Sequence, residues 1–520
     1  MANRDGQDEI MSSQPVPFAP QTIETLQRAF RLAASRRHDM VGLEHLLLAA
    51  TGEPEAVAIL AACGVDVDSL RVSLDDMLSR AFTPMPAAAV SDAIGRSVTA
   101  HQRLRALSFD ERATWMREAA KLLKARKQRY GRLLTEEMGK TFTAAVAEVE
   151  KCAWVCSYYA DHAAAQLADR PITTEAGRAY ASYLPIGPVL AVMPWNFPFW
   201  QVFRFAAPAL MAGNTGLLKH ASNVPGSALA IAEIFSDAGF PADCFQTLLI
   251  GADQVERVIA DPRVRAVTLT GSEGAGIAVA AAAGKHIKKT VLELGGSDPF
   301  IVMPSADFDK AVDTAVTART LNNGQSCIAA KRFIVHRAIY PRFRDAFVAA
   351  FEALKVGDPM LKSTDIGPLA TAAGRNDLTA QVAETVAAGA RRLCGAEPVK
   401  GEGYFFTPGI LEEVPERSIG FREELFGPVA LLFSVDDLDE AIALANSSRF
   451  GLGSAIFTRD QQEISQAVRE LDSGSTFVNA MVASDPRLPF GGVKASGYGR
   501  ELSEDGIREF TNIKTVSIAA

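Results

Sequence analysis

One cysteine of this chain stands in a setting suited to covalent chemistry. Cys327 lies within LNNGQSCIAAKRF, residues 321–333, after a Gly-Gln-Ser approach and shortly before a pair of alanines and two cations. Small neighbours leave its sulfur open to attack and let another molecule approach the backbone, whereas a cysteine that only fills a core needs neither. Cys327 is therefore a candidate nucleophile, and a half-buried structural thiol is the alternative.

Two further side chains could assist such a nucleophile. Asn196 lies among aromatic residues and prolines in MPWNFPFWQVFR, where a rigidly held amide can donate a hydrogen bond to a developing oxyanion. Glu293 lies in the apolar stretch VLELGG, and burial raises the pKa of a carboxyl group toward the range of a general base. A turn asparagine and a structurally paired glutamate are the alternatives.

Two segments could hold a phosphorylated cofactor. In VTLTGSEGAG, Gly271, Ser272 and Gly276 lie where a strand ends and a helix opens, so free N–H groups and the helix dipole favour a phosphate. A tight turn is the alternative, because the spacing is not the Gly-x-Gly-x-x-Gly fingerprint. In LLKHASNVP, Lys219 ends another strand, and Ser222 follows where an acid would repel the extra phosphate of NADP. We therefore expect NADP, with NAD as the alternative.

Strands that alternate with alanine-rich helices must position these groups. This alternation predicts two α/β domains with mostly parallel, buried sheets that meet near residue 296. Residues 170–187 differ, because two alternating runs flank a Glu-Ala-Gly-Arg turn and predict a β-hairpin with exposed edges. The strands are expected at 189–195, 215–220, 245–251, 266–272 and 289–296, and then at 298–303, 331–336, 429–435 and 453–458.

A separate helical module is expected before these domains. After a polar start, residues 18–80 carry apolar residues at helical spacing, and FTPMPAAAV at 82–90 is typical of a linker. The expected organisation is a helical module at 1–85, a dinucleotide-binding domain at 86–169 and 188–295, an oligomerisation element at 170–187 and 506–520, and a catalytic domain at 296–505.

Composition narrows the class of protein. The chain has 520 residues and a net charge of −8, which offers no basic surface for nucleic acid or an anionic membrane. Six cysteines without regular spacing predict no disulfide framework, and Cys152 and Cys156 lack further ligands nearby, so we expect no metal site. The polar N-terminus shows no secretory signal, and four prolines in the apolar tract 184–203 would break a membrane span. We expect a cytoplasmic protein.

Taken together and in this order, the motifs resemble those of the aldehyde dehydrogenase superfamily. The resemblance spans about residues 88–518 and rests on PWNFP, TGSEGAG, LELGGSDP, GQSC, EELFGPV and PFGGVKASGYGRE. The interval of 34 residues from Glu293 to Cys327 also matches the family. The resemblance implies the family's α/β fold, with a Rossmann-like cofactor domain, an α/β catalytic domain and a β-hairpin oligomerisation element, preceded here by a small all-α module.

The resemblance also implies a mechanism. The Cys327 thiolate attacks the aldehyde carbon, and the Asn196 amide and the Cys327 N–H hold the resulting oxyanion. Hydride passes to the nicotinamide and leaves a thioester, for whose hydrolysis Glu293 activates water. The matching cofactor contacts are Lys219 and Ser222 at the adenine ribose, Ser272 at the pyrophosphate, Glu424 and Phe426 at the nicotinamide ribose and ring, and Pro194 and Trp195 in the wall beside it.

Within the superfamily, LLKHASNVP, ELGGSDPFIV and CIAAKRFIV resemble the short succinate-semialdehyde dehydrogenases. Arg204 and Ser484 match contacts to the substrate carboxylate, and Trp200 would wall the pocket; the alternative for Arg204 is a surface ion pair. Residues 328–329 are Ile-Ala, where some relatives have the second cysteine of a redox switch, so we expect no disulfide here. NAD-dependent oxidation of another aldehyde, and an inactive scaffold that binds a chaperone or adaptor, are the alternative functions.

Residues 18–80 resemble half of the N-terminal domain of Clp-type chaperone ATPases, through RAFRLAASRRHDMVGLEHLLLAA and ILAACGVDVDSL. Such domains dock adaptors or substrates, which implies a protein partner for this module. A helical cap without a binding function is the alternative. The hairpin and the last strand, TNIKTVSIA, predict a homodimer or homotetramer.

Overall fold

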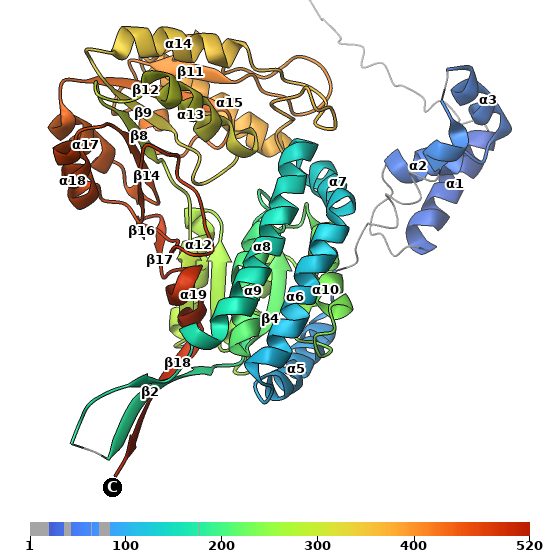
Figure 1. The fold of residues 1–520 in the computed structure, drawn as a ribbon. Helices are drawn as coiled ribbons and strands as arrows, with labels where there is room; N and C mark the ends of the chain where they lie inside the picture. The colour runs from blue at the N-terminus through green and yellow to red at the C-terminus, as the bar shows by residue number, and fades with distance from the viewer. Residues whose placement is uncertain (1–19, 36–42, 64, 72–83, 176, 520) are drawn as a thin grey trace, which may run out of the picture. The chain divides into compact units, whose positions relative to one another are not determined.

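The computed structural model describes residues 20–35, 43–63, 65–71, 84–175 and 177–519, in two compact units that divide after Pro84. The first unit is helical, with α1 (Pro20–Ser35), α2 (Leu43–Ala50) and α3 (Pro54–Ala62) (Figure 1). Ala29 and Ala49 are buried where α1 and α2 pack together, whereas Ile23 and Phe30 of α1 are 45% and 63% exposed. The polar start and the last part of the expected helical spacing, residues 72–80, lie outside the described residues.

The expected linker at 82–90 is wrong in its second half. Pro86 is the N-cap of α5 (Ala87–Leu104), and the three alanines that follow have high helix propensity. Val90 and Ile94 of α5 are buried in the core of the larger unit. The alanines that resemble a linker therefore start a helix of the main fold, while residues 82–83 lie outside the described residues.

The first half of the larger unit is built on a six-stranded sheet of order β17-β7-β6-β3-β4-β5. All neighbouring strands pair in parallel except β17, which pairs antiparallel with β7. Most residues of its central strands are buried, as expected for a sheet covered on both faces. The bounds are β3 (Pro188–Met193), β4 (Thr215–His220), β5 (Phe245–Thr247), β6 (Ala266–Thr270), β7 (Lys289–Glu293) and β17 (Gly497–Tyr498).

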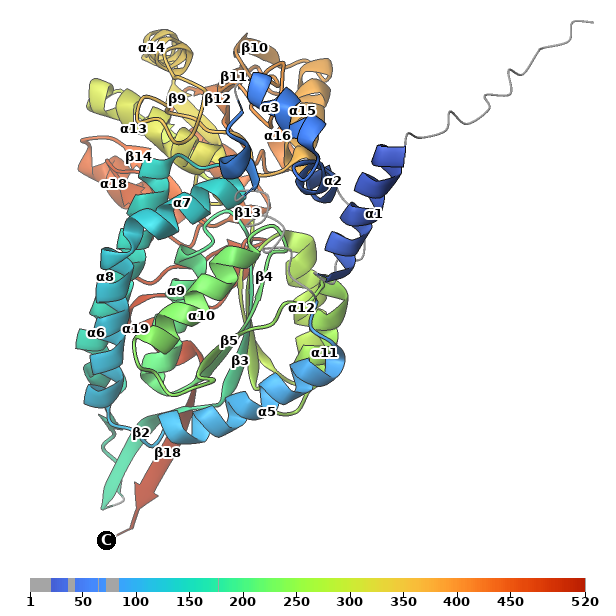
Figure 2. The same cartoon turned by 90° about the vertical axis from the view of Figure 1, so that its right-hand side faces the viewer.

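Helices cover both faces of this sheet (Figure 2). Successive residues of β3 show the division, because Val189 and Ala191 pack into one core cluster and Leu190 into the other. The first cluster includes α6 (Phe109–Ala125), α7 (Lys127–Met138), α8 (Phe142–Gln166), α9 (Trp200–Ala212) and α10 (Pro225–Asp237). The second includes α5, α11 (Val255–Ala260) and α12 (Glu273–Lys285), with the 3₁₀ turn η1 (Ala252–Gln254) leading into α11.

The second half holds a seven-stranded sheet of order β10-β11-β12-β9-β8-β14-β15, parallel except for the edge strand β10 (Figure 1). Its strands are β8 (Pro299–Val302), β9 (Arg332–His336), β10 (Arg391–Cys394), β11 (Gly409–Glu412), β12 (Val429–Val435), β14 (Ser454–Phe457) and β15 (Thr476–Val478). The helices are α13 (Phe308–Thr320), α14 (Tyr340–Glu352), α15 (Ala372–Ala387), α16 (Ile419–Arg422), α17 (Leu438–Asn446) and α18 (Gln461–Glu470), with η2 (Leu321–Gly324) after α13. The β13 (Phe450–Gly451) and β16 (Val493–Lys494) strands form a separate pair.

A three-stranded ribbon projects from the first half (Figure 1). It consists of β1 (Arg170–Pro171), β2 (Arg178–Pro185) and the C-terminal β18 (Thr511–Ile518), all antiparallel. The chain reaches β18 through β17 and α19 (Ser503–Glu509), which contacts α9. The segment expected to be catalytic up to residue 505 therefore returns to the first half before it ends. Ala176, in the expected hairpin turn, lies outside the described residues.

The apolar tract 184–203 divides among several elements. It forms the end of β2, all of β3, the loop 194–199 and the start of α9. Ser108, Ser272 and Asp307 cap α6, α12 and α13 with side-chain hydrogen bonds, which accounts for these helix starts. In the part of the chain that is described, no helix has both the length and the apolar composition needed to cross a membrane.

Candidate active site

Cys327 lies in a loop between η2 and β9, with its side chain partly exposed. The approach to it is a tight backbone turn, because Asn322, Asn323 and Gly324 all have positive φ, of 59°, 59° and 74°. A Cβ at Gly324 would lie 2.4 Å from the carbonyl carbon of Gly427, so only glycine fits this point of the turn. The turn fixes the backbone immediately before the nucleophile.

Two buried cations hold this loop from behind. Arg319 donates to the carbonyl oxygens of Gly324 at 3.0 Å and Ala330 at 2.9 Å. Lys331 Nζ donates to the carbonyl oxygens of Ser326 at 2.8 Å and Cys327 at 2.7 Å, and forms an ion pair of 2.8 Å with Glu424. Of the two cations noted after Cys327 in the sequence, Lys331 thus fixes the loop of the candidate nucleophile, and Arg332 Nε donates to the Ser297 carbonyl at 2.8 Å.

Burial disfavours the thiolate form of Cys327. It raises the pKa of the thiol to about 12, although the nearby Lys331 ammonium acts in the opposite direction. The thiolate that attacks an aldehyde therefore has to form as the proton leaves the sulfur.

Asn196 is tied directly to the nucleophile loop. Its Nδ2 donates to the Gln325 carbonyl at 3.1 Å, and Asn322 Nδ2 donates to the Asn196 carbonyl at 2.7 Å. An amide has two N–H donors, so one Asn196 hydrogen is left for another acceptor. The Cys327 N–H also has no hydrogen-bond acceptor within the described residues. These donors fit the predicted stabilisation of an oxyanion.

Glu293 ends β7 and is only 2% exposed. Neither of its carboxylate oxygens has a hydrogen-bond partner in the described ranges. Burial raises its pKa well above the usual range and the neighbouring Glu501 raises it further, while Arg204 and Arg500 act in the opposite direction. A Cβ at Gly491 would lie 2.9 Å from Glu293 Oε1, so this glycine makes room for the acid. A raised pKa brings a carboxyl group toward the range in which it can act as a general base.

One cavity of about 280 Å³ lies at the carboxyl ends of β3 and β6, and we call it the strand cavity. Trp195 and Phe426 meet edge to face across it, with ring centroids 5.7 Å apart. A Cβ at Gly295 would lie 2.5 Å from Glu424 Oε2, so glycine permits Glu424 to reach the wall. The lining residues are Pro194, Trp195, Asn196, Gln201, Thr270, Gly271, Ser272, Leu294, Gly295, Cys327, Glu424 and Phe426.

Three of the predicted cofactor residues do not line the strand cavity. Lys219 is the last residue but one of β4 and has no ion-pair partner among the residues described, and Ser222 is exposed just beyond this strand. The Gly276 N–H donates to the Ser272 carbonyl, and a Cβ at Gly276 would lie 2.6 Å from the Leu294 side chain. Gly276 therefore allows α12 to pack closely on Leu294, the residue after β7, and its N–H is already bonded within the helix.

The start of α12 and the carboxyl edge of the first sheet have features that fit a dinucleotide. The first turn of α12 presents backbone N–H groups, and a Cβ at Gly271 or Gly274 would meet no close contact, so a ligand can approach the backbone there. β4 lies two strands from β6 in the sheet, with β3 between them. Lys219 near the end of β4 and Ser222 just after it lie at the same carboxyl edge as α12. The carboxyl edge of a parallel sheet is where α/β folds bind nucleotides.

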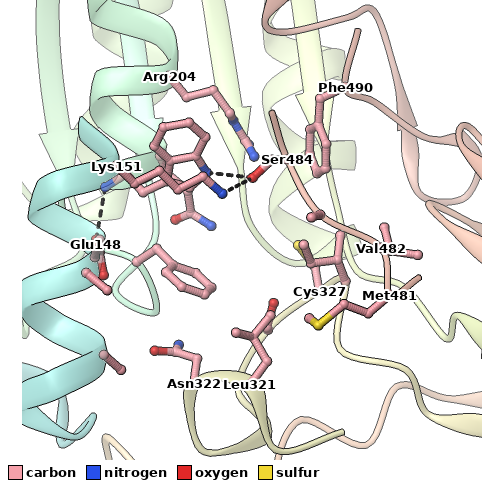
Figure 3. Close-up of a pocket in the computed structure, with 18 residues that line it drawn as sticks. Glu148, Lys151, Arg204, Leu321, Asn322, Cys327, Met481, Val482, Ser484 and Phe490 are labelled. Carbon is pink, nitrogen blue, oxygen red and sulfur yellow. Dashed lines mark hydrogen bonds between the residues drawn. The ribbon is translucent and has the colours of Figure 1, made fainter. Parts of the chain in front are cut away.

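A second cavity, of about 250 Å³, lies beside α8 and α9, and we call it the helix cavity (Figure 3). The predicted residues Trp200, Arg204 and Ser484 all line it. Lys151 of α8 also lines it and donates to Ser484 Oγ at 2.8 Å. Lys151 could not be singled out from the sequence, because a lone lysine on a helix is usually solvated. Cys327 lines both this cavity and the strand cavity.

Arg204 does not form a surface ion pair. It is 3% exposed and pairs with the buried Glu501, while its Nη2 donates to Thr270 Oγ1 at 3.3 Å. Its guanidinium also lies 4.6 Å from the centre of the Phe490 ring. The bulk of its charge is thus balanced inside the protein, by an acid that sequence reasoning missed.

A buried ion pair joins Glu148 of α8, which lines the helix cavity, to Lys140 just before this helix. Glu148 Oε1 accepts hydrogen bonds from the N–H groups of Phe199 and Trp200, both at 2.9 Å, at the start of α9. Lys140 pairs with Glu148 and lies 4.2 Å from the centre of the Phe197 ring. This pair anchors the first turn of α9, which carries Trp200 and Arg204.

Comparison with known proteins agrees with this site. Residues 79–516 match the model of the aldehyde dehydrogenase family, and the chain belongs to that family. Residues 17–104 match the Clp repeat (R) N-terminal domain, which extends past the first unit into α5. The sequence had indicated both resemblances.

Individual relatives are similar to this chain over most of its length. The chain is 56% identical over 418 residues to the probable succinate-semialdehyde dehydrogenase (NADP+) of Synechocystis sp., a match that covers 80% of this chain and 92% of the relative. It is 54% identical over 445 residues to the succinate-semialdehyde dehydrogenase (NADP+) of Mycobacterium avium, covering 85% and 94%. The crystal structure of succinic semialdehyde dehydrogenase from Streptococcus pyogenes, in complex with NADP+ as the cofactor, superposes with a TM-score of 0.83 at 39% identity and covers 84% of this chain and 97% of that one.

Proposed function

We propose that this enzyme oxidises succinate semialdehyde to succinate with NADP as its cofactor. The observation that carries the proposal is the position of Cys327, which lines a cavity with cationic walls on one side and a nucleotide-type cavity on the other. The relatives with this activity in their names support the choice of aldehyde and cofactor. A panel of short aldehydes assayed with NADP and with NAD tests it, and an equal rate on all of them would contradict it.

The residues of the chain divide the chemistry among them. Cys327 attacks the aldehyde carbon as its thiol proton passes to a solvent water, while Asn196 and the Cys327 N–H stabilise the oxyanion. Glu293 takes a proton from the water that hydrolyses the thioester. The bound nicotinamide supplies the acceptor for the hydride that the substrate carbon gives up.

The cofactor would be held by Ser272 and the start of α12, by Glu424 and Phe426, and by Lys219 with Ser222. Replacement of Ser222 by glutamate places a negative charge beside the extra phosphate of NADP, so kcat/KM with NADP should fall about tenfold or more while that with NAD is kept. Ser236→Glu, at an exposed serine near the end of α10, is the matched control. If Ser222→Glu leaves the ratio of the two cofactors unchanged, the basis for choosing NADP is lost.

We also propose that the N-terminal unit recruits a protein partner. Its exposed apolar side chains, Ile23, Phe30, Leu47 and Ile59, support this, since they are 39–65% exposed. Deletion of residues 1–84 should then leave kcat within about twofold, because the catalytic residues all lie in the larger unit. Loss of folding would contradict a purely recruiting role. The alternative of an inactive scaffold has no use for Cys327, Asn196 and Glu293.

We place the enzyme in the cytoplasm as a homodimer or homotetramer. All six cysteines are free thiols, which suits a reducing compartment. The projecting β18 exposes Ile513 and Ile518 at 61% and 47%, and apolar residues on an exposed strand favour pairing with a second subunit. Light scattering of the purified protein tests the oligomer, and a monomer would contradict it.

A further inference from the structure

Lys151 is a cation of the helix cavity, and within the described residues it forms no ion pair with any carboxylate. It extends from α8 into the cavity, and its Nζ lies 4.3 Å from the centre of the Trp200 ring. Arg204, the cation expected to bind substrate, is paired with Glu501. A negative charge that enters this cavity is therefore attracted by an ammonium group that has no directly paired carboxylate.

Two hydrogen bonds to Ser484 orient both Lys151 and the serine hydroxyl. Ser484 Oγ accepts from Lys151 Nζ at 2.8 Å and from Trp200 Nε1 at 3.0 Å, and both of these groups can only donate. The hydroxyl proton of Ser484 is consequently free to donate to a third group. The ammonium of Lys151 keeps two further N–H donors.

Much of the remaining lining of the cavity is apolar. Phe197, Leu321, Ile328, Met481 and Val482 belong to it, and the polar residues Glu148, Gln201, Asn322 and Ser326 also line the cavity. Figure 3 shows Lys151, Ser484 and Arg204 gathered on one side, with Cys327 apart from them. Such a cavity suits a short aliphatic chain with an aldehyde at one end and an anion at the other.

We propose that Lys151 joins Ser484, a carboxylate contact that the family resemblance implies, at the carboxylate-binding end of the aldehyde pocket, and that Lys151 sets the preference of the enzyme for aldehydes with a terminal carboxylate. This inference rests on the proposed function, since it names the residue that selects the substrate. Two N–H groups of Lys151 and the Ser484 hydroxyl donate to the carboxylate as charge-assisted hydrogen bonds. Arg204, paired with Glu501, lines the same cavity.

The charge of Lys151 is sensitive to pH. Burial lowers its pKa to about 8, and Arg204 of α9 lowers it further. Cys152 and Glu148 on α8 and Asp485 on the loop after β15 act in the opposite direction. The ammonium is therefore charged at neutral pH and loses its charge as the pH rises through about 8. The affinity for a carboxylate should fall over the same range.

The test compares succinate semialdehyde with butanal, which has the same chain length and no charge. In Lys151→Met, kcat/KM for succinate semialdehyde should fall about 10- to 100-fold, as expected for loss of a charge-assisted hydrogen bond, while kcat/KM for butanal stays within about twofold. Butanal turnover also reports that the variant is folded. Lys121→Met removes an exposed lysine of α6 by the same change and should alter neither substrate.

A second measurement needs no substitution. In the wild-type enzyme, the ratio of KM for succinate semialdehyde to KM for butanal should rise between pH 7 and 9.5, whereas Lys151→Arg, whose charge persists, should show a flat ratio. A Lys151→Met enzyme that keeps the wild-type preference, or a wild-type ratio that does not change with pH, overturns the assignment of Lys151. A wild-type enzyme that shows no preference between the two aldehydes overturns the proposed function, and the assignment with it.

Discussion

The nucleophile and the acid of this site are held in opposite ways. Around Cys327, the loop carbonyls accept hydrogen bonds from Arg319 and Lys331. Around Glu293, both carboxylate oxygens lack a hydrogen bond in the described structure, and the nearby Glu501 repels its charge. The backbone around Cys327 is fixed by hydrogen bonds from two buried cations, whereas the surroundings of Glu293 disfavour its ionisation.

The difference follows from what each group has to do. The sulfur must meet the aldehyde carbon at bonding distance, and errors in position cost rate steeply. The acid must exchange a proton with water, which requires a pKa near the working pH and some freedom from permanent partners. Substitutions around Cys327 should therefore impair the position of the sulfur, whereas substitutions around Glu293 should impair proton transfer.

The largest effect is expected for Cys327→Ala. Without the sulfur no thiohemiacetal forms, so kcat should fall by about 10⁴-fold or more. Steady-state NADPH formation from succinate semialdehyde measures it, with NADP binding as a check on folding. Oxidation at the wild-type rate would remove the catalytic assignment altogether.

A smaller loss is expected for Glu293→Gln. The amide cannot activate water, so kcat should fall by about 10²- to 10³-fold, while the first turnover continues. Stopped-flow absorbance should show a burst of NADPH equal to the enzyme concentration before the slow phase. Glutamine is close to isosteric with glutamate, and burial already raises the pKa of Glu293 and so disfavours its charge, so the thermal stability should change little. Absence of a burst would mean that Glu293 acts before the thioester forms.

Lys331→Met tests the hydrogen bonds that hold the loop of Cys327. The change leaves the Ser326 and Cys327 carbonyls without their donor and Glu424 without its cation, so the free energy of unfolding should fall by roughly 3–5 kcal/mol. We expect kcat to fall about tenfold, because the sulfur is displaced and still present. Thermal unfolding and kcat are measured together, beside Lys121→Met as the control. A wild-type melting temperature together with a wild-type kcat would show that the hydrogen bonds of Lys331 are not needed to hold this loop.

The smallest effect is a shift in pH dependence for Glu501→Gln. The pKa of Glu293 is raised, so its basic form increases as the pH rises, and hydrolysis should increase with it. Removal of the Glu501 charge leaves Arg204 unopposed and lowers the pKa of Glu293, which should move the rise in kcat to lower pH. The profile of kcat against pH measures this, under conditions where the burst shows hydrolysis to be slow. An unmoved profile would mean that another group sets it.

Contiguous motifs made much of the fold and site predictable. Strands such as 215–220 and 332–336 are short apolar runs bounded by helices, and their alternation indicates a parallel sheet. Asn196 and Cys327 each stand in an unusual local sequence, so each could be singled out before the structure brought them together.

The role of a residue could not be predicted where it depends on a contact with a residue far away in the sequence. Lys151 is an ordinary helical lysine until Ser484, 333 positions away, is placed against it. Arg204 could be assigned to a carboxylate, but not to Glu501, because that pair also joins distant segments. Gly276 was misjudged for the same reason, since its contact with Leu294 appears only once α12 packs on β7.

The shared lining of the two cavities by Cys327 has a consequence for inhibition. An alkylating reagent can reach the sulfur from either of two entrances, so a molecule bound in one of them shields it from only one direction. Iodoacetamide should therefore still inactivate the enzyme when nucleotide alone is present, at a reduced rate. Full protection should require a carboxylate analogue at the opposite entrance as well.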